Sequence, residues 1–267
     1  MHFELSPATF VAFLLALVRA SAWVAIGPPF SSRMIPVQVK IGLAAALALS
    51  VTPQLATQDI PMSTPGLIGA IALQVVLGLA LGYLTQVLFT AVQAAGELVD
   101  LFGGFTIASA YDPFSQSVSS VFGRFYNLLA TMILFAINGH LLLVKGFLTS
   151  FTAVGVTGLR MSDFSELLLH DIGLFMLAAV QIAAPLLAVL FLSEVGLGLL
   201  TRAALQFNVF AVAMPAKILL TLTLAGLALP LLPDALSNLL DDALRSGATV
   251  AEDSMVAAPT PEIVVRR

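Results

Sequence analysis

The residue types that do chemistry in enzymes are sparse in this chain and are not grouped. Its three histidines, His2, His140 and His170, lie far apart, and no pair has the spacing of metal ligands. There is no cysteine, so neither a thiolate nucleophile nor a thiolate metal site can form. The HExxH, GxSxG and phosphate-loop signatures are also missing. The sequence therefore predicts a protein that is not an enzyme and that holds no metal or cofactor.

Ionisable residues inside apolar segments are better functional candidates, because a charge in a bilayer is costly. They are Arg19, Lys40, Glu97, Asp100, Lys145, Glu194, Arg202 and Lys217. Most lie near the ends of apolar segments, where a long cationic side chain can reach the interface without any further role. We favour that interpretation for Lys40, Lys145 and Lys217. Arg19 lies deeper, so we expect it to face another helix or a partner protein.

Two of these residues, Glu97 and Asp100, are three positions apart and so share one helical face. They precede Gly103 and Gly104, which predicts a helix with an acidic end followed by a glycine hinge. Two interpretations remain open. The carboxylates are solvated at a membrane interface, or they mark a helix break inside an assembly.

Residues 101–122 form the most unusual segment, LFGGFTIASAYDPFSQSVSSVF. The segment combines two glycines, a turn signal at Asp112-Pro113 and several serines with five aromatic residues. The aromatic residues are Phe102, Phe105, Tyr111, Phe114 and Phe122. Irregular backbone at membrane depth is tolerated where it is buried in protein or lines a cavity, and apolar side chains can seal such a cavity against water. An ordinary interfacial loop explains the composition equally well.

Composition places these residues in a membrane protein. Of 267 residues, 59% are hydrophobic and 10% are charged, against about 25% charged in soluble domains. The mean hydropathy is +1.03. These values exclude a cytosolic enzyme and a disordered chain. A net charge of −4 without an internal basic cluster argues against a nucleic-acid partner.

The apolar runs predict an all-α, membrane-associated fold of about six to seven hydrophobic, partly kinked helices. The runs cover residues 8–27, 41–58, 60–96, 125–144, 172–193, 203–216 and 218–233. No lysine or arginine precedes the first run, so we expect a retained helix there rather than a signal peptide. We predict one helical domain over residues 1–240 and a polar, flexible tail over 241–267.

The run at 60–96 is longer than the hydrocarbon thickness, so its helix must tilt, kink or leave the bilayer. It contains Gly78 and Gly82, a GxxxG spacing that permits close helix approach. Because apolar segments rich in glycine and alanine produce this spacing by chance, we favour the chance interpretation over specific packing.

A weak internal echo supports a different class of function. Thirteen positions separate Lys40 from Pro53, and thirteen separate Lys217 from Pro230. Matched, broken helices with inward-facing charges are typical of secondary transporters and ion channels. This class remains the alternative to a subunit of a larger assembly.

Several short motifs resemble the FliR family, a subunit of the flagellar type III export gate whose injectisome counterpart is SctT. In chain order they are Arg19, Pro28-Pro29-Phe30, Ile35-Pro36, Lys40, Gly96-Glu97-Leu98, Gly104-Phe105, Asp112-Pro113, Asn138-Gly139-His140, residues 202–210, Pro215 and Lys217. Their order and spacing run from about residue 8 to 233. The chain departs from the pattern at Leu205, where the family usually has proline.

The resemblance implies a non-enzymatic role in the bacterial inner membrane, within the flagellar basal body. One FliR-like chain joins several FliP-like and FliQ-like subunits in a gate, and its fold resembles a FliP-like part joined to a FliQ-like part. A FlhB-like subunit would surround the cytoplasmic mouth, and unfolded export substrates would pass through the centre. Membrane lipid would surround the assembly.

The resemblance also implies roles for individual residues. The candidates for a pore-closing plug are Phe102, Gly103, Gly104, Phe105, Tyr111, Asp112, Pro113 and Phe114. The candidates for helix or partner contacts are Arg19, Glu97, Asp100, Asn138, His140, Arg202, Gln206, Asn208 and Lys217.

Overall fold

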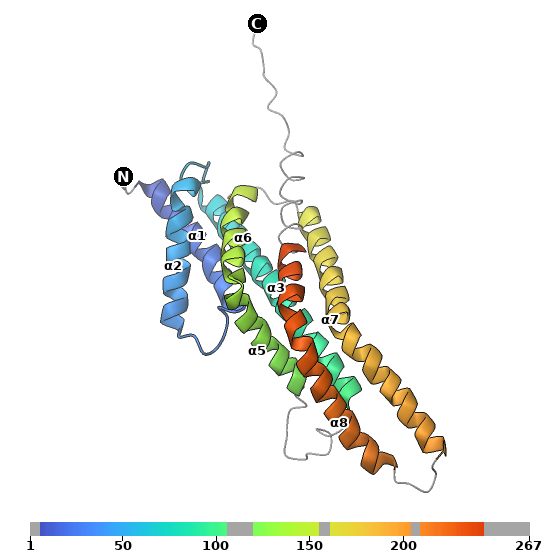
Figure 1. The fold of residues 1–267 in the computed structure, drawn as a ribbon. Helices are drawn as coiled ribbons and strands as arrows, with labels where there is room; N and C mark the ends of the chain where they lie inside the picture. Colours follow the sequence, from blue (N-terminus) through green and yellow to red (C-terminus); the bar gives the residue numbers. More distant parts are fainter. Residues whose placement is uncertain (1–5, 106–119, 155–160, 204–208, 243–267) are drawn as a thin grey trace, which may run out of the picture. The chain divides into compact units, whose positions relative to one another are not determined.

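A computed structural model describes residues 6–105, 120–154, 161–203 and 209–242, and these ranges contain helices without strands (Figure 1). The helices are α1 (Pro7–Ile26), α2 (Val37–Leu55), α3 (Thr64–Gly103), α5 (Val121–Ala136), α6 (Gly139–Ala153), α7 (Met161–Ala203) and α8 (Val209–Ala228). A short 3-10 helix, η1 (Leu229–Leu231), follows α8, and residues 232–242 are again helical. The predicted all-α fold is confirmed.

Four helical stretches are long and apolar enough to cross a membrane. They are Pro7–Ile26, Thr64–Gly103, Ile172–Leu199 and Ala213–Asp242. The pair α5 and α6 would make a fifth, broken span. The chain is therefore a membrane-embedded protein, as its composition predicts.

Local signals explain where α1 begins and ends, and α3 is unusually long. The Ser6 side chain caps α1 by accepting a hydrogen bond from the Thr9 N–H at 3.2 Å. At the other end the Gly27 N–H bonds to the Trp23 carbonyl at 2.7 Å, before two prolines. The 40 residues of α3 give a length of about 60 Å, so the expected overlong helix is confirmed.

Two predicted helix boundaries differ from the structure. The apolar run at 125–144 contains a break, because α5 ends at Ala136 and α6 starts at Gly139. The break is at Asn138, whose φ of 57° lies in the left-handed region that asparagine tolerates. Conversely, the apolar runs at 203–216 and 218–233 are not separate helices, since α8 runs continuously through Lys217. A charge can sit inside this helix because it has a partner, described below.

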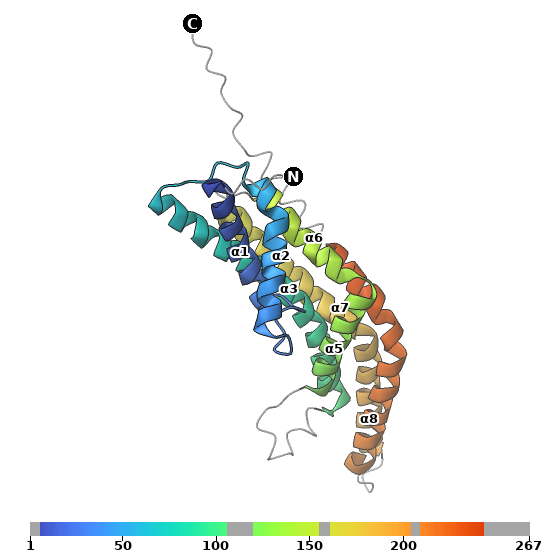
Figure 2. The same cartoon turned by 90° about the vertical axis from the view of Figure 1, so that its left-hand side faces the viewer.

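The chain divides into two compact units. Unit 1 comprises Met1–Thr85, Leu141–Asp171 and Asp241–Arg267, and unit 2 comprises Gln86–His140 and Ile172–Leu240. In unit 1, α1 and α2 lie side by side (Figures 1 and 2) and share a core with α6. Trp23 stacks on Phe147 there, with ring centroids 4.6 Å apart. The predicted boundary between a gate domain and a tail at residue 240 stays a prediction, since residues 243–267 lie outside the described ranges.

Candidate functional site

The two glycines after the acidic helix end terminate α3. Gly104 has a φ of 82°, a conformation that glycine adopts without strain just past a helix end. Gly103 is buried against α8, where an added Cβ would lie 2.7 Å from Thr221 Cγ2. A Cβ on Gly104 would meet Lys217 Cδ at 3.6 Å. The predicted glycine turn is therefore present, and it packs the end of α3 onto α8 within unit 2.

Asp100, one turn before this end, is bonded to the start of α5. Its side chain is 3% exposed, and its Oδ2 atom accepts two hydrogen bonds. One comes from the Ser120 hydroxyl and the other from the Phe122 backbone N–H at 3.1 Å. The Asp100 Oδ1 atom is buried and has no hydrogen-bond partner among the described residues. Asp100 thus joins two helices, rather than marking a solvated helix end.

The start of α5 completes this junction. Ser120 is the N-cap residue, and its hydroxyl oxygen accepts a hydrogen bond from the Gly123 N–H at 2.7 Å. The Phe105 and Phe122 rings meet edge to face, with centroids 5.2 Å apart. We call Asp100, Phe105, Ser120 and Phe122 the α3–α5 junction. Its polar and aromatic contacts hold residues 105 and 120 close together.

Below the junction, α3 and α5 run antiparallel at close range. A Cβ added to Gly96 would lie 2.5 Å from the Phe122 carbonyl oxygen, so only glycine fits there. Glu97, unlike Asp100, is exposed, and it accepts a hydrogen bond from Gln93 Nε2 at 2.9 Å. The Gln93 Oε1 atom in turn accepts a hydrogen bond from Asn127 Nδ2 at 3.2 Å. The two carboxylates that share a helical face in sequence therefore differ in environment.

Arg19 is the most deeply buried charged side chain that the described residues of unit 1 contain, at 1% exposure. Its guanidinium donates to Gln74 Oε1 at 2.6 Å, to the Ser150 carbonyl and hydroxyl oxygens at 3.0 and 3.2 Å, and to the Val154 carbonyl oxygen at 3.1 Å. It also lies over the Phe151 ring, 4.0 Å from the centroid. Arg19 thus connects α1 to α3 and to the end of α6 within the chain, and it faces other helices as expected.

The GxxxG pair on α3 packs against the same part of α1. A Cβ on Gly78 would lie 2.4 Å from the Arg19 carbonyl oxygen. A Cβ on Gly82 would lie 3.2 Å from the Trp23 carbonyl oxygen. The chance interpretation of this spacing is wrong. Both glycines let two backbones approach each other, which is the physical purpose of the motif.

The Asn138-Gly139-His140 motif forms the break between α5 and α6. Asn138 is exposed, and Gly139 is buried where a Cβ would lie 2.8 Å from Leu240 Cδ1. The His140 ring packs on Phe135 at 4.9 Å, and its buried Nδ1 atom has no hydrogen-bond partner in the part of the chain that the structure describes. The motif therefore forms a turn in which the glycine is tightly packed.

Lys217 on α8 forms an ion pair with Glu194 on α7. The lysine side chain is 12% exposed and the glutamate side chain 61%. Snorkelling alone does not account for Lys217, since its ammonium group has this carboxylate partner. Lys40 donates to the Ser31 carbonyl oxygen at 2.9 Å, while Lys145 and Arg202 are exposed.

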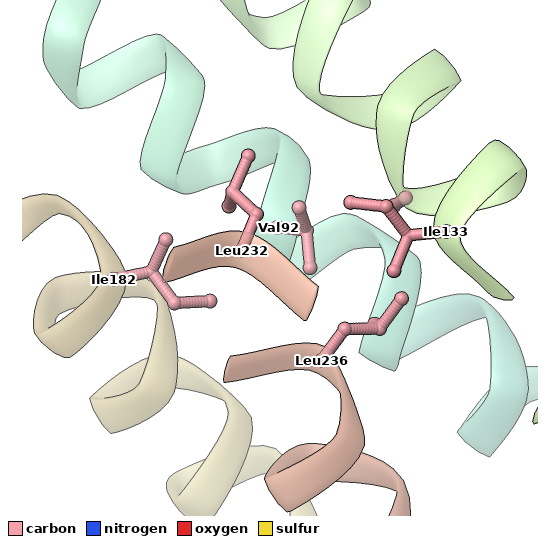
Figure 3. A pocket seen from close by; sticks show the side chains of 6 residues that line it. Val92, Ile133, Ile182, Leu232 and Leu236 are labelled. Carbon is pink, nitrogen blue, oxygen red and sulfur yellow. The ribbon is translucent and has the colours of Figure 1, made fainter. Parts of the chain in front are cut away.

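Figure 3 shows a small pocket within unit 2. It is lined by Val92, Ala130, Ile133, Ile182, Leu232 and Leu236, from α3, α5, α7 and the helical residues after η1. All six side chains are aliphatic, and they leave no room for a water molecule. Across the described ranges no three histidine, aspartate or glutamate side chains gather as metal ligands. The six lining residues therefore form tight, apolar helix packing within unit 2.

Sequence reasoning found some of these residues and missed others. Tyr111, Asp112, Pro113, Phe114, Gln206 and Asn208 lie outside the described residues, as does Leu205, so their predicted roles stay predictions. The partners of Arg19, namely Gln74, Ser150 and Phe151, were not predicted, because they are distant in sequence. Ser120 was also missed as a site residue, although a serine before an apolar helix is a recognisable N-cap signal.

Comparisons with known proteins show which sequences this chain is similar to. Residues 10–243 match the family described as bacterial export proteins, family 1. The chain is 30% identical to the flagellar biosynthetic protein FliR of Escherichia coli K12, over 81% of this chain and 83% of the relative. It is 32% identical to FliR of Bacillus subtilis 168, over 78% and 82%. It is also 30% identical to the Yop proteins translocation protein T of Yersinia pestis, over 77% and 80%.

Proposed function

The chain belongs to the bacterial export proteins, family 1, and from this membership we propose that it is a non-enzymatic subunit of the flagellar type III protein export gate. The observation that carries the proposal is the family match, which covers residues 10–243. Relatives that are 30% and 32% identical to this chain are named flagellar biosynthetic proteins. The four candidate membrane spans support a role inside a membrane.

The proposal includes specific partners and a place in the cell. One copy of this chain assembles with FliP-like and FliQ-like subunits in the bacterial inner membrane, at the flagellar basal body. A FlhB-like subunit contacts the assembly, and unfolded export substrates are its cargo. The large apolar side chains left exposed on α7 and α8, such as Leu192, Leu219 and Leu227, are suited to contacts with lipid or with such subunits.

We further propose that the chain helps to form and close the central channel. The closing segment would include Phe102 and Phe105 together with the predicted plug residues Tyr111 and Phe114. Apolar rings in a narrow channel exclude water and ions. The Phe105–Phe122 contact supports this assignment, because it fixes one of the rings at the end of α3. Arg19, Glu97, Asp100, Asn138, His140, Arg202, Gln206, Asn208 and Lys217 would support packing within the chain or against partners.

Ion leakage through the assembled complex tests the closing role. Phe105→Gly combined with Phe114→Gly removes two rings and should allow the channel to fill with water. We expect the purified complex in planar bilayers to conduct ions where the parent complex stays closed. A double variant of normal composition with unchanged conductance would contradict the plug assignment.

A second candidate is the equivalent subunit of an injectisome, which the 30% identity to the Yersinia translocation protein favours. Complementation separates the two candidates. We expect this chain to restore swimming in a strain that lacks its flagellar FliR and to leave injectisome secretion unrestored in a strain that lacks its SctT. The reverse pattern would assign the chain to the injectisome.

A further inference from the structure

We infer that Asp100 is a positioning residue, which fastens the end of α3 to the start of α5 and thereby fixes where the channel-closing segment leaves and rejoins the helices. This inference rests on the proposed function, in which the residues following Phe105 close the channel. The residues that carry it are described and lie on either side of that segment. Glu97, the exposed carboxylate on the same face as Asp100, instead accepts a hydrogen bond from Gln93 on its own helix.

The first step is the way one carboxylate oxygen joins the two helices. The Asp100 Oδ2 atom accepts hydrogen bonds from the Ser120 hydroxyl and from the Phe122 N–H. The Phe122 N–H is one of the first-turn donors of α5, which have no partner inside the helix. Asp100 therefore caps α5 from a different helix, 22 positions earlier in the chain.

The second step concerns charge. A carboxylate at a helix N-terminus interacts favourably with the helix dipole, which offsets part of the cost of burying Asp100. The offset is incomplete, because no described residue bonds to the buried Oδ1 atom. An apolar side chain would be buried here at lower cost, so the carboxylate is better explained by the specific connection that it makes than by stability alone.

The third step is register. The glycine contact between Gly96 and the Phe122 backbone brings the two helices together but contains no directional bond. A helix pair held by apolar contacts alone can slide or rotate, whereas the two hydrogen bonds to Asp100 permit one arrangement. Asp100 and Gly96 together therefore set the position of Phe122, and through the ring contact that of Phe105.

A distance measurement tests this inference directly, since the chain has no cysteine of its own. Leu101→Cys and Val121→Cys place spin labels at exposed positions on the two sides of the junction, 58% and 60% exposed in the parent chain. Dipolar broadening of the continuous-wave electron paramagnetic resonance spectrum, which suits two labels this close together, then reports the distribution of distances between α3 and α5. The measurement is made on the full chain within the purified complex, with partner cysteines replaced by serine.

We expect Asp100→Ala to broaden the distance distribution and to raise ion leakage through the complex about tenfold, because the cap and the interhelical bonds are lost together. Asp100→Asn keeps an acceptor oxygen and should return both readouts close to those of the parent. Arg124→Gln, which removes an exposed charge from the first turn of α5, is the matched control, and it should change neither. Ser120→Ala removes the hydroxyl bond to Asp100 and the cap on the Gly123 N–H, but it leaves the bond from the Phe122 N–H to the carboxylate, so it should broaden the distribution less than Asp100→Ala does.

An unchanged distance distribution in both Asp100→Ala and Ser120→Ala overturns the inference, whatever the leakage. Broadening in Arg124→Gln as large as in Asp100→Ala also overturns it. A broadened distribution without leakage supports the positioning role and contradicts the channel-closing part of the proposed function. The distance can also be measured on the full chain alone in detergent, so the inference remains testable if no complex forms.

Discussion

Arg19→Lys is the substitution that most sharply separates a structural cation from a simple positive charge. Lysine keeps the charge and most of the aliphatic length of arginine, but its single ammonium group cannot reproduce the planar fork of the guanidinium. In this structure the fork reaches Gln74 on α3 and both Ser150 and Val154 at the end of α6. A lysine ammonium group could donate either to Gln74 or to the acceptors at the end of α6, but not to both at once.

The magnitude follows from the bonds that are lost. The guanidinium makes four hydrogen bonds, and a lysine would keep at most two of them. Each lost bond leaves a buried acceptor unsatisfied, at a cost of about 1–3 kcal/mol. The cation–π contact with Phe151 is weakened as well, by about 1 kcal/mol. Allowing for relaxation and water entry, we expect the free energy of unfolding of unit 1 to fall by about 3 kcal/mol.

Trp23 provides the assay, because it is the single tryptophan of the chain and lies one turn after Arg19. It is 2% exposed and stacked on Phe147, so its emission should shift to longer wavelength when unit 1 unfolds. Unfolding is followed in mixed micelles with increasing sodium dodecyl sulfate. Arg33→Lys, at an exposed position in the same unit, is the control and should change the midpoint little. An Arg19→Lys protein within about 0.5 kcal/mol of the control would refute the reasoning.

Two further predictions test close helix contacts. Gly78→Ala places a Cβ 2.4 Å from the Arg19 carbonyl oxygen and should destabilise unit 1 by about 1–3 kcal/mol in the same Trp23 assay. Gly69→Ala on the same helix meets nothing within 4 Å and should stabilise it by up to about 1 kcal/mol, and equal effects of the two would argue against the α1–α3 contact. Asn138→Val should lower the thermal midpoint, measured by helical circular dichroism, because a β-branched residue tolerates a φ of 57° poorly. Asn138→Gly should be tolerated, and a Val variant as stable as the Gly variant would contradict the left-handed turn.

The sequence was sufficient to predict features that depend on neighbouring residues. The first helix was expected at 8–27 and is found at Pro7–Ile26, because a serine cap and a Gly-Pro-Pro stop bound an uninterrupted apolar run. The break at Asn138 was missed, although Asn138-Gly139 is a recognised turn dipeptide, because a long apolar run surrounds it. The positive φ of Asn138 and the packing of Gly139 on Leu134 and Leu240 reveal the turn.

Features that depend on distant residues could not be predicted in this way. Arg19 was expected to face a helix, but its acceptors lie 55 to 135 positions away along the chain. Glu97 and Asp100 share a helical face by spacing, yet one is exposed and the other is buried. The difference arises because the start of α5 buries Asp100 but leaves Glu97 exposed. Periodicity contains no information about that covering helix.

Co-purification tests the central claim of the account, that this chain works as one subunit of an export gate. The tagged chain is expressed with and without its FliP-like and FliQ-like neighbours, and the native mass of the purified particle is measured. We predict a stable particle that contains one copy of this chain among several partner subunits, and an unstable chain when it is expressed alone. A stable, monodisperse particle of this chain alone, which does not bind those neighbours, would contradict this claim and favour a transporter.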